Sequence, residues 1–359
     1  MPLVAHSALP TFTRLKEEGE YVLQPGRAHK QDIRELHIGL LNMMPDSALQ
    51  STERQFMRLI GNSNRIAQFH MHPFTLAGIE RNPETQRYIN QHYYSFEDLA
   101  QQGLDALIIT GANVSGDFVS APFWSELTAV LDYARAHITS TLCACLATHA
   151  ALQHFYGIER RPLPQKRWGV YSHRTSRGRV HPLIRTSNTK FDVPHSRFND
   201  VSEDQLTSAN LRVLINSADA GFHLGVSEDL FRFVFLQGHP EYDRNSLLKE
   251  YKREVMRFLR AEVTAYPPLP ENYLTKEGRE IATKFRQRVL DSNDRASLLG
   301  AFPEETIEDT TDNTWRDSAR TVFSNWIGLV YQITHQDRKK PFMKGINPED
   351  PLGLRFPAA

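Results

Sequence analysis

The spacing of apolar residues changes repeatedly along the chain, and these changes predict alternating strands and helices. Short apolar runs and two-residue alternation are typical of strands, whereas apolar residues three and four positions apart are typical of helices. The predicted strands are 36–42, 66–72, 105–110, 140–144, 211–216 and 230–236. The predicted helices are 47–60, 124–138, 146–156, 246–259, 276–299 and 315–333.

Short connections between these elements predict the fold class. Strand, helix, strand, helix in close succession is the pattern of a parallel sheet covered on both faces. Pro and Gly scattered over the first thirty residues predict an irregular arm. The proline-rich segment 264–270 (T-A-Y-P-P-L-P) predicts the end of the main domain, and residues 304–312 are predicted to form an acidic loop. We therefore expect an N-terminal arm, an α/β domain, a C-terminal helical extension that packs on the core, and a poorly ordered tail. Their ranges are 1–34, 35–263, 264–340 and 341–359.

Composition narrows the function classes. The 359 residues include 42 Lys+Arg and 42 Asp+Glu, and this balance argues against a general binder of nucleic acid or membrane surfaces. No apolar run reaches the roughly 18–20 residues of a membrane-spanning helix. The N-terminus lacks the basic flank and apolar core of a signal peptide. We expect a cytoplasmic protein without a disulfide framework, because Cys143 and Cys145 lie too close in sequence to bridge each other.

Cys145 lies at a predicted strand–helix junction, within S-T-L-C-A-C-L-A-T-H-A-A-L. A side chain at such a turn lies at the carboxyl end of the sheet, where open α/β folds bind ligands. The unpaired N–H groups of a helix N-terminus favour a thiolate, and that of Leu146 could stabilise an oxyanion. The alternative is that both cysteines are small buried apolar residues.

His239 and Glu241 follow the predicted strand 230–236, in Q-G-H-P-E-Y. Pro240 favours an extended His239, and residues i and i+2 of an extended segment project to the same side. Glu241 can therefore orient the imidazole toward a nucleophile elsewhere, as in a catalytic triad. The alternative is a polar pair that caps the next helix.

Three further segments carry weaker signals. His70 and His72 have a spacing that could bind a metal, but the sequence shows no third ligand, so we predict no metal site. The basic pairs 160–161 and 166–167 are either a solvated loop or a site for carboxylate or phosphate groups. Residues 194–197 (P-H-S-R) combine donors and acceptors in an expected post-strand loop.

Nine short motifs follow one another along the chain: N-M-M-P, R-Q-F, I-I-T-G-A, S-T-L-x-x-C, F-Y-G-I, K-R-W-G-V-Y, P-H-S-R, G-H-P-E-Y-D and N-W-I-G-L-V-Y-Q-I-T. In their order and spacing they resemble the homoserine O-succinyltransferase family of bacterial methionine biosynthesis, from about residue 10 to about 340. The resemblance implies a flavodoxin-like α/β domain, similar in fold to class I glutamine amidotransferases, with a Cys–His–Glu triad.

The resemblance also implies roles for individual residues. Cys145 matches the nucleophile that carries the acyl group as a thioester, His239 the proton acceptor, and Glu241 its orienting partner. Three further positions match substrate-binding residues. These are Lys166, Ser196 (linked to substrate choice) and Arg253, whose guanidinium suits the carboxylate of the amino acid.

The chain departs from the family pattern at several positions. Leu146 replaces a common tryptophan, His149 replaces a common glutamine, and the loop after Gly111 is one residue shorter. In the family, one position in this loop is small in succinyl users and glutamate in acetyl users. That position aligns with Ser115 or, with a one-residue shift, Gly116, and this predicts succinyl-CoA as the donor.

The resulting expectation is a ping-pong acyltransferase that moves a succinyl group from succinyl-CoA to the hydroxyl of L-homoserine. Succinyl-CoA is a co-substrate, and we expect no metal or redox cofactor and no nucleic-acid or membrane partner. The alternatives are acetyl transfer from acetyl-CoA, a glutaminase, and a non-catalytic binding module. Segment 315–333 could cover a homodimer contact or close the core.

Overall fold

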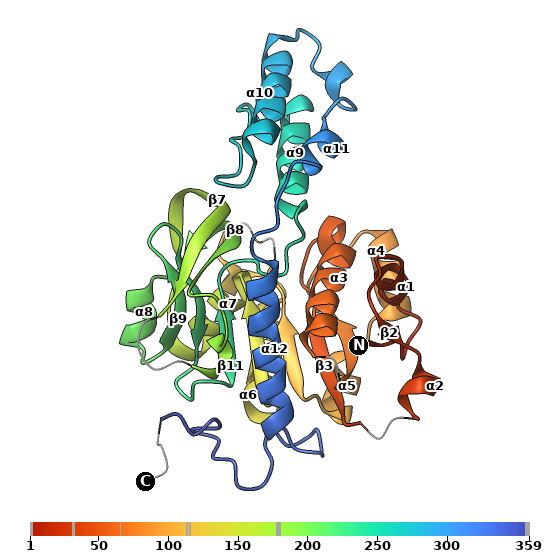
Figure 1. Ribbon diagram of the computed structural model, residues 1–359, viewed down its shortest axis with the longest axis vertical. Coiled ribbons are helices and arrows are strands. Elements are labelled where there is room, and N and C mark those ends of the chain that lie inside the picture. Colours follow the sequence, from red (N-terminus) through yellow and green to blue (C-terminus); the bar gives the residue numbers. More distant parts are fainter. Residues whose placement is uncertain are drawn as a thin grey trace.

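A mixed sheet forms the centre of the molecule in the computed structural model (Figure 1). The structure describes residues 3–30, 33–64, 66–112, 114, 116–176 and 181–355. Within these residues the sheet has eleven strands, in the order β2-β1-β4-β3-β5-β6-β11-β10-β9-β7-β8.

Five parallel strands form the middle of this sheet. They run in the order β4-β3-β5-β6-β11, which is the 2-1-3-4-5 order of flavodoxin-like folds. The predicted fold class is therefore confirmed. These strands are β3 (Glu35–Leu41), β4 (Gln68–Phe74), β5 (Ala106–Ile109), β6 (Ser140–Ala144) and β11 (Phe233–Leu236).

Six further strands extend the sheet at both edges. Two very short strands continue it beyond β4, and four antiparallel strands continue it beyond β11. The first group is β1 (Leu3–Val4) and β2 (Val22–Leu23). The second is β7 (Arg161–Thr175), β8 (Lys190–Asp200), β9 (Arg212–Ser217) and β10 (Gly221–Val226).

Helices cover both faces of the parallel sheet because its strands carry apolar residues on both faces. Ile38 packs into one buried cluster with residues of α3 and α12, whereas Leu107 packs into a second cluster with residues of α6 and α7. The helices are α1 (Pro10–Glu17), α2 (Pro25–Ala28), α3 (Asp46–Ser63), α4 (Pro83–His92), α5 (Phe96–Gln102), α6 (Trp124–His137), α7 (Leu146–Tyr156), α8 (Glu203–Ser208), α9 (Ser246–Leu259), α10 (Lys276–Asp291), α11 (Glu304–Glu308) and α12 (Arg316–Ile333).

The C-terminal part of the chain packs in two places. Helices α10 and α11 join α9 in a lobe at the top of Figure 1, built on a third apolar cluster. Helix α12 instead lies beside α3, where Phe323 and Trp326 are fully buried. The apolar face of segment 315–333 therefore closes the core of its own chain. No helix in the described part of the chain is both long and apolar enough to cross a bilayer.

Several local expectations are wrong. The first thirty residues are not irregular, since α1 and two short strands form there, and the acidic loop contains helix α11. Segment 194–197 lies inside strand β8 rather than in a loop. The described part of the tail packs closely: Phe342 is buried, and the Thr139 hydroxyl donates to the Pro341 carbonyl. The four domain boundaries themselves stay a prediction.

Candidate active site

Cys145 forms the turn between β6 and α7. Its backbone has φ 52° and ψ −111°, a region that costs a non-glycine residue about 1–3 kcal/mol. The backbone N–H of Cys145 donates to the Leu236 carbonyl at 2.7 Å, which fixes the turn to the neighbouring strand β11. Cys145 is partly exposed, whereas Cys143 is fully buried, and both are free thiols. The strained turn thus leaves Cys145 partly accessible, whereas Cys143 stays enclosed in the core.

Leu146 is the first residue of α7, directly after the cysteine. The first N–H groups of an α-helix have no acceptor within the helix. The Leu146 N–H therefore lies among the unpaired donors of this helix end, and its role as an oxyanion donor stays a prediction. Gly111 faces the same sulfur, because a Cβ on Gly111 would lie 3.9 Å from Cys145 Sγ and 3.3 Å from its Cβ. A residue without a side chain keeps this approach to the sulfur open.

His239 and Glu241 form the side-chain pair that the sequence predicts. Nδ1 of His239 lies 2.8 Å from Oε1 of Glu241, and both side chains are buried. Because an ionised carboxylate only accepts hydrogen bonds, Nδ1 carries the proton. Nε2 of His239 is then free for Cys145, with which the imidazole also makes a side-chain hydrogen bond.

The charges around His239 favour its protonated form. Burial alone would lower the pKa of His239, but the Glu241 carboxylate and the Cys145 sulfur raise it well above its ordinary value. Two guanidinium groups interact electrostatically with the Cys145 sulfur as well, those of Arg160 and Arg197. The Cys145 sulfur therefore interacts with the imidazole of His239 and with two guanidinium groups.

A pocket of about 180 Å³ opens at Cys145 and contains most of the predicted site residues. The predicted residues that line it are Cys145, Leu146, Lys166, Ser196, His239 and Arg253. They come from five separate parts of the chain: the turn between β6 and α7, strand β7, strand β8, the segment after β11, and helix α9. Glu241 does not line this pocket and contacts His239 at Nδ1, the ring nitrogen that does not face Cys145.

Glu250 is a pocket residue that the sequence analysis misses. Its carboxylate accepts from Ser196 Oγ at 2.6 Å and from the Tyr242 hydroxyl at 2.7 Å, and it lies 3.1 Å from Lys166 Nζ. Burial would raise the pKa of Glu250, but Lys166 and these donors lower it. The ionised carboxylate therefore holds Lys166 and Ser196 together. Glu250 precedes Arg253 by three positions on α9, a helical spacing that could have indicated it.

Arg253 is the most open of the predicted substrate residues. Its side chain is 52% exposed, and its Nε lies 3.3 Å from Oε1 of Glu254. Lys166, in contrast, is held over the Trp168 ring at 4.1 Å. Of the two predicted cations, Lys166 is thus held in place in the pocket, whereas Arg253 is largely exposed.

The loop after Gly111 reaches the pocket through Ala112 and Val114. Of the two predicted donor-specificity positions, Ser115 lies outside the described residues. Gly116 does not line the pocket, and its carbonyl accepts from Arg160 at 2.6 Å. Gly116 has φ 88°, so any side chain there strains the backbone.

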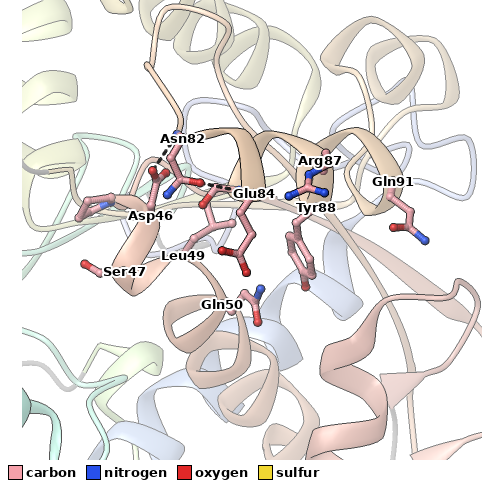
Figure 2. A pocket seen from close by; sticks show the side chains of 11 residues that line it. Asp46, Ser47, Leu49, Gln50, Asn82, Glu84, Arg87, Tyr88 and Gln91 are labelled. Carbon is pink, nitrogen blue, oxygen red and sulfur yellow. Dashed lines mark hydrogen bonds between the residues drawn. The ribbon is translucent and has the colours of Figure 1, made fainter.

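A larger pocket of about 960 Å³ lies next to the cysteine pocket, and Pro45 lines both. Figure 2 shows that its walls come from the N-terminal part of α3 and from α4, with Gln50, Glu84 and Tyr88 pointing into it. Its charged lining residues are Asp46, Glu84 and Arg87. Two carboxylates against one guanidinium disfavour an anionic ligand such as a phosphate.

Comparison with known proteins identifies close relatives over the whole chain. The model of a protein family described as homoserine O-succinyltransferase matches residues 2–336. The homoserine O-succinyltransferase of Methylobacter tundripaludum is 56% identical over 355 residues, covering 99% of this chain and 100% of the relative. That of Nitrosococcus oceani is 57% identical over 358 residues, with the same coverage of both chains.

Solved structures give more distant matches. A glutamine amidotransferase from Methylobacillus flagellatus is 11% identical, with a TM-score of 0.42, over 83% of this chain and 95% of that one. A glutamine amidotransferase from Thermotoga maritima is 11% identical, with a TM-score of 0.39, over 84% of this chain and 98% of that one.

Proposed function

The chain belongs to the homoserine O-succinyltransferase family, and from this premise we propose that Cys145 carries the succinyl group between succinyl-CoA and L-homoserine. The observation that supports this role most directly is the strained, partly exposed Cys145 hydrogen-bonded to a histidine that a buried carboxylate orients. As an acyltransferase of methionine biosynthesis, the enzyme transfers a succinyl group to homoserine.

The first half-reaction uses the ion pair of Cys145 and His239. The Cys145 thiolate attacks the thioester carbonyl of succinyl-CoA, and the oxygen of the tetrahedral intermediate accepts from the Leu146 N–H. The bond from the carbonyl carbon to the sulfur of CoA breaks, and His239 donates its Nε2 proton to the leaving thiolate. The products of this step are free CoA and a succinyl thioester on Cys145.

The second half-reaction reverses the proton transfer. Nε2 of His239 accepts the proton of the homoserine hydroxyl as its oxygen attacks the Cys145 thioester. The carbon–sulfur bond to Cys145 breaks, and O-succinyl-L-homoserine leaves. No atom changes its oxidation state in either step, so we propose that the chemistry requires no redox cofactor and no metal.

The charges of the pocket suit these substrates. Four Lys and Arg side chains line it against the single carboxylate of Glu250, and Glu250 is already paired with Lys166. The terminal carboxylate of the succinyl group and the carboxylate of homoserine would each gain from a guanidinium partner. We propose that Arg253 binds the homoserine carboxylate and that Ser196 and Lys166 contact substrate beside it.

Incubating the enzyme with succinyl-CoA in the absence of homoserine tests this proposal. We expect one succinyl adduct on the Cys145 peptide by mass spectrometry, and its transfer when homoserine is then added. A glutaminase, or a binding module without chemistry, would leave Cys145 unmodified by succinyl-CoA.

We expect Arg253→Ala to weaken the use of homoserine far more than the acylation of Cys145. The exposed guanidinium lies at the mouth of the pocket, so removing it leaves the Cys145–His239 pair intact. Losing a charge-assisted hydrogen bond costs about 1.5–3 kcal/mol, which is roughly a 10- to 150-fold loss in kcat/KM for homoserine.

Single-turnover acylation by succinyl-CoA measures the other half-reaction for this variant, with Arg257→Ala on the same helix as the matched control. Loss of acylation in Arg253→Ala would assign Arg253 to the donor side instead.

We expect wild-type enzyme to prefer succinyl-CoA to acetyl-CoA, and Ser115→Glu to depress succinyl transfer selectively. A glutamate in the acyl pocket would repel the terminal carboxylate of the succinyl group. Ser115→Gln, which has the same size without the charge, separates repulsion from crowding. The ratio of kcat/KM for the two donors is the measurement, and a wild-type preference for acetyl-CoA would refute succinyl specificity.

A further inference from the structure

A cluster of histidines lies on strands β3 and β4, away from Cys145. Glu35 and His37 are the first and third residues of β3, and His70 and His72 are the third and fifth residues of β4. The parallel register places His37 opposite His70, so all four side chains project from the same face of the sheet. Cys145 follows the carboxyl end of β6, so the cluster lies toward the opposite end of the parallel strands.

Three potential ligand atoms meet in this cluster. One nitrogen each of His37 and His70 and a carboxylate oxygen of Glu35 all lie within 4.8 Å of one another. Oε2 of Glu35 lies 3.4 Å from Nε2 of His37 and 3.7 Å from Nε2 of His70. Two imidazoles and a carboxylate form a common ligand set for divalent transition metals.

Several buried nitrogens in the cluster and in the neighbouring His6 have no hydrogen-bond partner among the described residues. They are Nε2 of His6, Nε2 of His70 and Nδ1 of His72. His70 and His72 are 7% and 4% exposed, and a buried polar atom without a partner costs about 1–3 kcal/mol. His6 donates from Nδ1 to the Val4 carbonyl, so its unpaired Nε2 carries a lone pair, and its ring centroid lies 4.9 Å from that of His70.

The hydrogen bonds around the cluster resemble those behind a metal ligand. Nδ1 of His37 lies 2.9 Å from Nε2 of His72. When His37 donates this hydrogen bond from Nδ1, the Nε2 atom of His37 carries a lone pair that faces the Glu35 carboxylate. A cation between Nε2 and the carboxylate would remove the repulsion between these two electron-rich groups.

We propose that Glu35, His37 and His70 bind a divalent transition-metal ion such as Zn²⁺, with His72 as the positioning residue that orients His37. The site joins β3 to β4, and a fourth position remains for His6 or a water molecule. The sequence alone shows only the pair His70 and His72, and the strand register supplies the other two ligands. Because no catalytic residue takes part, this proposal does not rest on the proposed function.

Arg338 opposes the binding of a cation. Its positive charge interacts electrostatically with His37, His70 and His72. We therefore expect Arg338→Gln to bind the metal more tightly than the parent chain, which a merely structural histidine cluster would not predict.

A Co²⁺ titration of the full-length Cys145→Ser protein tests the site, because this background removes a thiol that could bind the metal beside His239. We expect one Co²⁺ per chain, visible d–d absorption, and displacement by Zn²⁺. Glu35→Gln and His70→Asn should lose this binding, whereas His137→Ala, an exposed histidine on α6, should keep it. His72→Asn should weaken it by roughly 10- to 100-fold.

Circular dichroism establishes that each variant is folded, and Glu35→Gln keeps the test informative if a buried histidine variant is not. The Glu35 side chain is 35% exposed and nearly unchanged in shape by this substitution. The proposal would be overturned if the Cys145→Ser protein bound no Co²⁺. It would also be overturned if folded Glu35→Gln and His70→Asn variants bound Co²⁺ as tightly as the Cys145→Ser protein does.

Discussion

Cys145→Ala is expected to abolish succinyl transfer, whereas Cys143→Ala should retain most of it. Cys145 forms the strained turn and contacts His239, so its sulfur is the one presented to substrate. Cys143 is fully buried in the apolar cluster beneath α6 and α7, and burial raises the pKa of its thiol far above the ordinary range. Steady-state kcat/KM and the mass of the succinyl adduct measure the two effects.

Cys143→Ala also serves as the control for damage to the strand that both residues share. Its cavity should cost stability rather than chemistry, so thermal unfolding should report a lower Tm with an unchanged rate per folded molecule. Equal losses of activity in two well-folded variants would exclude Cys145 as the specific nucleophile.

Glu241→Gln is expected to lower kcat/KM by roughly a thousandfold or more while leaving the fold intact. The carboxylate fixes the tautomer of His239 and stabilises its imidazolium, and the loss of an equivalent carboxylate in a serine-protease triad costs about 10⁴-fold. The charge of Glu241 raises the pKa of His239, so removing it must lower that pKa. The limb of the pH–rate profile that reports His239 should therefore move to lower pH.

His239→Asn should be at least as severe as Glu241→Gln, because it removes the proton acceptor itself. Asp243→Asn provides a matched control, since this nearby carboxylate pairs with Arg58 and not with His239. A Glu241→Gln enzyme with near-wild-type kcat/KM would reduce Glu241 to a structural cap.

The elements that local pattern determines are predicted well. Strand β6, helix α7 and helix α9 have the predicted boundaries, since each combines a clear apolar period with a sharp end. Strands β7 and β8 are not predicted, because they form a long ribbon whose residues are exposed or half-buried over much of its length. Pro162, Pro164 and Pro194 within these strands also look like loop signals in the sequence.

The same distinction applies to the site. The His239–Glu241 contact is local and follows from two-residue spacing, so the sequence predicts it. The grouping of Lys166, Ser196 and Glu250 depends on the register that places Trp168 opposite Ser196, and on α9 packing beside this ribbon. Long-range register has no signature in a single sequence, which is why only the structure shows that Glu250 contacts both Lys166 and Ser196.

Helix α12 has a consequence for how the protein is made. The buried face of α12 packs on one face of the sheet, although all strands of that sheet precede α12 in the chain. Trp326 Nε1 donates to Ser140 Oγ at 2.8 Å. A nascent chain that has left the ribosome only as far as α11 already contains every strand of the described sheet, but the part of one apolar face that α12 covers is still bare. Completion of the fold must therefore wait until α12 has left the ribosome, and until then this part of the sheet is a surface for chaperones to shield.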